Sequence, residues 1–91
     1  MKNAHNAGII YGAQVRAARA LLRWSAEDLA REAKLGVATI RRGELIDGPI
    51  QSTAANTDAI RHALNAAGVE IIDENGGGIG VRLIKRRESK P

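Results

Sequence analysis

Residues 24–44 read WSAEDLAREAKLGVATIRRGE, and this stretch predicts two short helices joined by a tight turn. Ser25, followed three residues later by Asp28, forms a capping box in which Asp replaces the usual Glu or Gln, so a helix should begin there. Apolar residues then recur at helical spacing, at Leu29, Ala30 and Ala33. A turn is expected at residues 35–36, and a second helix is expected over residues 37–44.

A helix-turn-helix of this kind presents its second helix to a partner, most often the major groove of DNA. The charge distribution fits that use. Residues 1–43 hold eight Lys or Arg against three acidic residues, and residues 44–81 hold one Arg against six acidic residues. The last ten residues are again basic, with five Lys or Arg and one Glu. A basic first half and a basic tail suit a polyanionic partner, although each charge alone could equally be solvated surface.

A single small domain is expected from 91 residues. Trp24 and Tyr11 are the only aromatic residues, so the core must be built from Leu, Ile, Val and Ala. The absence of Cys excludes a disulfide framework and a thiolate metal site. His5 and His62 lie far apart in the sequence, which does not suggest a metal site. The sequence also shows no catalytic set of a nucleophile, a base and a residue that orients the base. We therefore expect no metal, no cofactor and no enzymatic activity.

No segment is long or apolar enough for a secretion signal or a membrane span, which predicts a soluble, cytoplasmic protein. Ahead of the two central helices, a first helix should run from Tyr11 or Ala13 to Arg23. After them, Asp47-Gly48-Pro49 predicts a turn, because Gly tolerates positive φ and Pro cannot continue a helix.

The last helix is expected to begin at a capping residue and to end before Gly68, which suits a helix stop. Thr53 is one possible cap and Asn56 is the alternative. Two β-branched runs, 69–72 and 79–84, then predict a hairpin that must pack on the helices or pair with another copy of the chain. The expected organisation is a disordered segment 1–8, a helix-turn-helix domain 9–68, a β-hairpin 69–85 and a basic tail 86–91.

These features resemble the XRE-type helix-turn-helix family, which includes the phage lambda-type repressors. The residues at family positions are Arg19, Ser25, Leu29, Ala30, Ala33, Thr39, Ile40 and Glu44. The segment Gly68-Val69-Glu70, followed by 74–78 and 80–83, is similar to a subfamily of short bacterial regulators, and the likeness spans about residues 9–86. The resemblance implies a mainly α fold, a lambda-repressor-like bundle of roughly four or five helices with a C-terminal β-hairpin.

The family register implies which residues meet DNA. The positions that face or flank the groove are Val37, Ala38, Thr39, Arg41 and Arg42. Arg42 is expected to read guanine through a bidentate bond to O6 and N7, whereas Arg41 is either a phosphate contact or solvated. Arg16 and Lys34 are expected to contact phosphates of any sequence. The implied partner is double-stranded DNA with an inverted-repeat operator, bound by a homodimer.

The resemblance also implies a structural ion pair. In the family, the residues equivalent to Arg19 and Glu44 form a largely buried pair that ties the first helix to the recognition helix. Loss of one partner would leave a buried charge and cost about 3–5 kcal/mol.

Several residues favour a different partner. Ala26 stands where many family members have a Gln that grips a phosphate, and Gly43 occupies a usually apolar position. Leu45 and Ile46 replace a polar turn and, if exposed, suit a protein surface better than a phosphate. The alternative function is therefore a degenerate helix-turn-helix antiactivator that binds another transcription regulator through Val37, Leu45 and Ile46. An antitoxin-like role in an operon is a third possibility.

Overall fold

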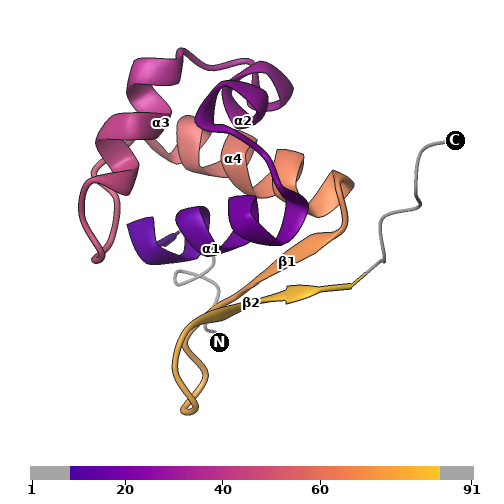
Figure 1. Cartoon of the computed structure of the whole chain (residues 1–91). Coiled ribbons are helices and arrows are strands. Elements are labelled where there is room, and N and C mark those ends of the chain that lie inside the picture. Colours follow the sequence, from indigo (N-terminus) through magenta and orange to yellow (C-terminus); the bar gives the residue numbers. More distant parts are fainter. Residues whose placement is uncertain (1–8, 85–91) are drawn as a thin grey trace, which may run out of the picture.

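The computed structural model describes residues 9–84, which form four helices and one two-stranded antiparallel sheet (Figure 1). The helices are α1 (Gly12–Leu22), α2 (Ala26–Ala33), α3 (Val37–Glu44) and α4 (Ala54–Ala66), and the strands are β1 (Val69–Ile72) and β2 (Gly80–Leu83). The expected mainly helical fold with a C-terminal hairpin is thus confirmed for these residues. The expected disordered segment 1–8 and basic tail 86–91 lie outside the described residues. No helix within 9–84 combines the length and apolar character needed to cross a membrane.

Local capping explains where the helices begin. The Ser25 hydroxyl accepts a hydrogen bond from the backbone N–H of Asp28 at 3.0 Å, and the Ser25 N–H donates to Asp28 Oδ2 at 2.9 Å. This reciprocal pair is the expected capping box at the start of α2. Thr53, rather than Asn56, caps α4, because the Thr53 hydroxyl accepts from the Asn56 N–H at 3.1 Å.

Two helices end on residues with left-handed backbone conformation. Arg23, after α1, has φ 59°, and Lys34, after α2, has φ 61°. This conformation ends a helix by turning the backbone so that the next N–H groups can reach the last free carbonyls. The first helix therefore ends at Leu22, one residue earlier than expected.

The core lies between the four helices and one face of the hairpin, and it is aliphatic. The largest fully buried side chains are Ile10, Leu29, Ile40, Leu64, Val15 and Val69. Trp24 is half-buried against this cluster and lies at its edge. The core is thus assembled from Leu, Ile, Val and Ala, as the composition predicts.

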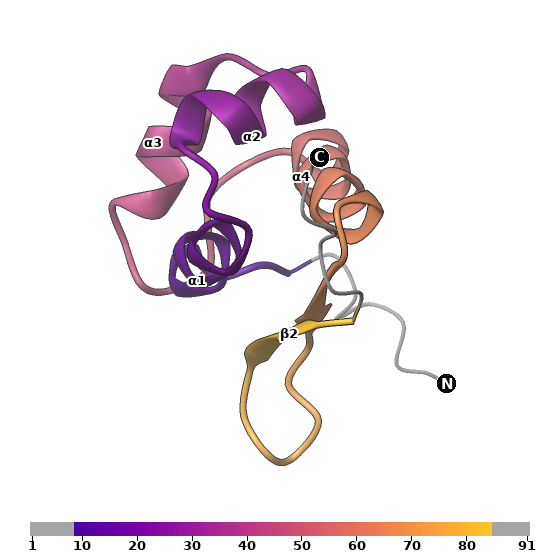
Figure 2. The same cartoon turned by 45° about the vertical axis from the view of Figure 1, so that its right-hand side comes forward.

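The hairpin pairs Val69 with Leu83 and Ile71 with Val81. Val69 and Ile71 are buried, so the strands contribute to the core. In Figures 1 and 2 the hairpin lies on the opposite side of α1 from α2 and α3. The buried amide of Gln14, on α1, donates to the carbonyls of Ile72 at 2.9 Å and of Gly80 at 3.0 Å, which fastens the loop end of the hairpin to α1.

Candidate functional site

The third helix, α3, has one inner face and one outer face. Ile40 is its fully buried side chain, and Val37, one turn earlier, is half-buried against the core. Positions three or four residues apart lie near one face of a helix, so Val37 and Ile40 mark the side of α3 that faces the core. Ala38, Arg41 and Arg42 are exposed, and we call these three residues the outer face of α3.

The C-terminal end of α3 is fixed to α1 by an ion pair. Arg19 Nε donates to Glu44 Oε2 and Arg19 Nη2 donates to Glu44 Oε1, both at 2.7 Å. Arg19 Nη1 also donates to the Trp24 carbonyl at 2.7 Å. The hydrogen bond to Glu44 raises the pKa of the Arg19 guanidinium, which is therefore charged at any working pH. The expected pair is present, and its side chains are mostly buried.

Arg16, one turn before Arg19 on α1, holds the same end of α3. Its guanidinium donates to the carbonyls of Glu44 at 2.6 Å and Ile46 at 3.1 Å, and it forms an ion pair with Asp47. These contacts hold the Arg16 guanidinium against the end of α3, while its side chain stays 40 % exposed. Arg16 therefore positions the loop after α3, and its expected contact with a phosphate stays a prediction.

Gly12 brings the start of α1 directly against that loop. Its N–H donates to the Gly48 carbonyl at 2.8 Å, and the Ile50 N–H donates to the Ile10 carbonyl at 2.9 Å. A Cβ atom at Gly12 would lie 1.9 Å from the Ile46 carbonyl oxygen. Only a glycine fits this approach, and nothing in the local sequence around residue 12 indicated it.

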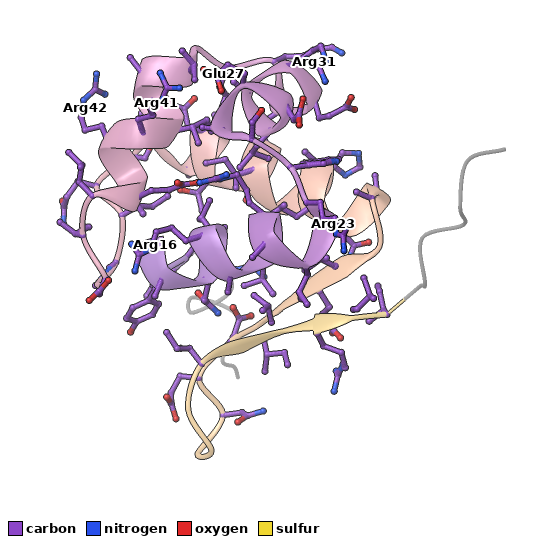
Figure 3. All side chains as sticks on the ribbon, viewed as in Figure 1. Arg16, Arg23, Glu27, Arg31, Arg41 and Arg42 are labelled. Atoms are coloured by element: carbon purple, nitrogen blue, oxygen red, sulfur yellow. The ribbon has the colours of Figure 1, made fainter. Side chains whose placement is uncertain are left out.

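The basic residues near α3 differ in their partners, as Figure 3 shows. Arg41 forms an exposed ion pair with Glu27 on α2. The pKa of Glu27 is lowered by a hydrogen bond from its own backbone N–H and then by the one from Arg41. Arg42 points away from the helices, and neither Arg42 nor Lys34 has an ion pair or a side-chain hydrogen bond within residues 9–84. These two side chains are the ones that can offer an uncompensated positive charge beside α3.

An apolar groove of about 550 Å³ lies beside the end of α3, bounded by the loop 45–53 and the start of α4. Buried side chains of Val15, Ile40 and Ile60 form its floor. Thr39 and Ile46 also line it, so Thr39 lies at the groove rather than on the outer face of α3. Leu45, at its rim, is 82 % exposed and Ile46 is 42 % exposed.

The structure therefore divides the predicted contact residues into three groups. Ala38, Arg41 and Arg42 share the exposed outer face of α3, with Lys34 just before the helix. Val37 packs inward, and Leu45 and Ile46 gather at the groove. Within residues 9–84, no three His, Cys, Asp or Glu side chains come together as a metal site.

Comparisons of the chain with protein-family models, with curated proteins and with solved structures found no match in any of the three.

Proposed function

We propose that this protein is a helix-turn-helix transcription regulator of the XRE type, in which α2 and α3 form the motif and α3 enters the major groove of operator DNA. The observation that carries the proposal is the outer face of α3. It is exposed along its length, while its C-terminal end is held to α1 by Arg19 and Arg16. A helix fixed at one end with an exposed face is the arrangement that groove insertion requires.

Arg42 is the proposed base reader. Its guanidinium is free among the described residues, and a free guanidinium can donate both bonds to guanine O6 and N7. Arg41 is the proposed phosphate contact, because its exposed ion pair with Glu27 contributes little stability and can be exchanged for a phosphate at low cost. Lys34 adds a second phosphate contact, and a dimer with two copies of α3 would recognise an inverted repeat. Such a regulator would act in the bacterial cytoplasm.

The test is a mobility shift on DNA from the regulator's own promoter, measured at two salt concentrations. Arg42→Ala is expected to weaken specific binding by about 1–3 kcal/mol and to relax preference at one base pair. Arg42→Lys keeps the charge and loses the bidentate geometry, so it should retain the salt slope and lose the base preference.

The matched control is Lys34→Gly. Glycine suits the left-handed backbone at residue 34, so this change removes one positive charge without adding strain. It should weaken binding to all sequences equally and flatten the salt slope. If Arg42→Ala behaves like Lys34→Gly, Arg42 is a phosphate contact and the base-reading assignment is wrong.

A second function, an antiactivator that binds another regulator, is favoured by one specific observation. Leu45 is 82 % exposed beside an apolar groove, and an exposed Leu next to a groove suits a protein contact. Leu45→Ser removes most of that apolar surface and leaves the outer face of α3 intact. Loss of regulation in cells with unchanged DNA affinity in vitro would favour this second function, whereas unchanged regulation would count against it.

A further inference from the structure

The outer edge of β2 carries backbone groups that the hairpin itself does not use. The Ile84 N–H donates to the Gly68 carbonyl at 2.8 Å, so residues 68 and 84 form a hydrogen-bonded pair of the antiparallel ladder. Because such pairs alternate with non-hydrogen-bonded ones, the N–H and C=O groups of Val81 and Leu83 point away from β1. Within residues 9–84 no hydrogen bond reaches these outward groups.

The same edge lacks two of the features that usually prevent strand pairing, proline and lysine, although β2 is only four residues long and carries one Arg. Residues 80–84 read GVRLI, without Pro or Lys. Leu83 is 41 % exposed and Ile84 is 49 % exposed. The one charged side chain, Arg82, is paired with Glu70 on the neighbouring strand, with Arg82 Nη2 2.6 Å from Glu70 Oε1. The edge is therefore apolar and close to neutral in charge.

We propose that β2 pairs with β2 of a second copy of this chain, antiparallel, about a two-fold axis at Arg82. In this register Val81 of each copy lies opposite Leu83 of the other, and each such pair exchanges both of its main-chain hydrogen bonds. The two small sheets become one continuous sheet in the order β1-β2-β2-β1. This proposal does not depend on the DNA-binding one.

The edge is self-complementary in this register. The apolar side chains of Val81 and Leu83 meet across the seam, on the face that packs toward the helices, and cross-strand apolar pairs stabilise a sheet. The two Arg82 side chains face each other on the solvent side, and like charges placed opposite each other oppose pairing. Each Arg82 keeps its own Glu70, which offsets that repulsion. A shift by two residues in either direction would leave Val81 or Leu83 without a partner inside β2.

A single cysteine tests the seam, because the chain has no native Cys. Residues 82 of the two copies would form a non-hydrogen-bonded pair with Cα atoms about 4.5 Å apart, which is within reach of a disulfide. Arg82→Cys should therefore cross-link into a dimer under mild oxidation. Two controls should form little cross-linked dimer: Ile84→Cys, which would lie opposite Gly80, and Glu70→Cys, which lies on the same face one strand further in.

A second variant removes a seam hydrogen bond together with the Leu83 side chain. Leu83→Pro removes an N–H that points away from β1, and Pro is tolerated at such edge positions. Sedimentation at micromolar concentration should show a dimer for the wild type and a monomer for this variant, with the helical circular dichroism retained. A monomeric wild type, a dimeric Leu83→Pro, or cross-linking at Ile84→Cys or Glu70→Cys in preference to Arg82→Cys would overturn the proposal.

Discussion

At the scale of single residues, the loop after α3 is held to the first helix by contacts that leave little room for change. Gly12 lies under the carbonyl oxygens of Ile46 and Gly43, which a Cβ at residue 12 would approach to 1.9 and 2.6 Å. Arg16 and Arg19 add side-chain bonds to the same end of α3. These groups together set where α3 lies relative to α1.

Gly12→Ala is expected to be clearly destabilising. The clash is with backbone atoms, which cannot rotate away, so the loop or α1 must shift at a cost of at least about 1–3 kcal/mol. The matched control is Gly43→Ala in α3, whose Cβ would meet the flexible Ile50 side chain at 3.3 Å. Alanine raises helix propensity there by about 1 kcal/mol, so this variant should be neutral or stabilising. Urea denaturation of both variants is the measurement, and equal stability of the two would contradict the prediction.

At the scale of elements, the helix boundaries follow from short-range chemistry, which is why the sequence predicts them. The capping box at Ser25 and the cap at Thr53 each join residues three apart, and α3 spans the expected residues 37–44. The contacts that the sequence did not predict span long distances along the chain. Arg16 reaches a carbonyl 28 residues away, and Gln14 reaches one 66 residues away. Such contacts depend on how the elements pack, and local propensity carries no information about packing.

The pair Arg19 and Glu44 is the exception among the long-range contacts, because the family resemblance implied it and the structure contains it. The expected phosphate contact of Arg16 stays a prediction, but the sequence did not foresee its bonds to the carbonyls after α3. A basic residue on the edge of α1 looks the same in sequence whether it faces solvent or the carbonyls at the end of α3. Only the position of the loop at residues 45–50 shows which of these two surroundings Arg16 has.

The capping box of α2 makes a prediction about pH. Hydrogen bonds from the Ser25 backbone N–H and then from Arg31 lower the pKa of Asp28 below its ordinary value. A carboxylate whose folded-state pKa is lowered stabilises the fold above its unfolded pKa, and this contribution is lost as the pH falls through the folded value. The wild type should therefore exceed Asp28→Asn in free energy of unfolding by the largest amount at neutral pH. This difference should shrink as the pH falls below about 4. Urea midpoints measured across that range would show a constant difference if the cap does not depend on the charge.

At the scale of the whole molecule, α1 is the element that joins the two ends of the fold. One side of α1 holds α3 through Arg16 and Arg19, and the other side carries the hairpin through Gln14 (Figure 2). The buried Gln14 side chain also accepts a hydrogen bond from the Tyr11 N–H at 2.9 Å. One amide thus connects the start of α1 to both strands.

Gln14→Met should loosen the hairpin and lower global stability. Met has a similar volume, but it leaves the Tyr11 N–H and the Ile72 and Gly80 carbonyls without this partner, at a cost of about 1–3 kcal/mol. Amide hydrogen exchange should accelerate most in β1 and β2. Glu70→Gln is the control, since it weakens an exposed ion pair in the same hairpin and should change stability by less than about 1 kcal/mol. Equal effects of the two changes would show that Gln14 does not fasten the hairpin.

The division of α3 into a side that is anchored to the core and its outer face has an evolutionary consequence. Ile40 and Glu44 hold the helix in place, while Ala38, Arg41 and Arg42 are exposed. Mutations at the three outward positions can accumulate without unfolding the protein, because surface substitutions of this kind usually change stability by less than about 0.5 kcal/mol. A library randomised at these positions should keep its fold, and under the proposed function selection would act on DNA recognition. Under that proposal, new operator sequences are accessible by single substitutions, each of which leaves a folded protein.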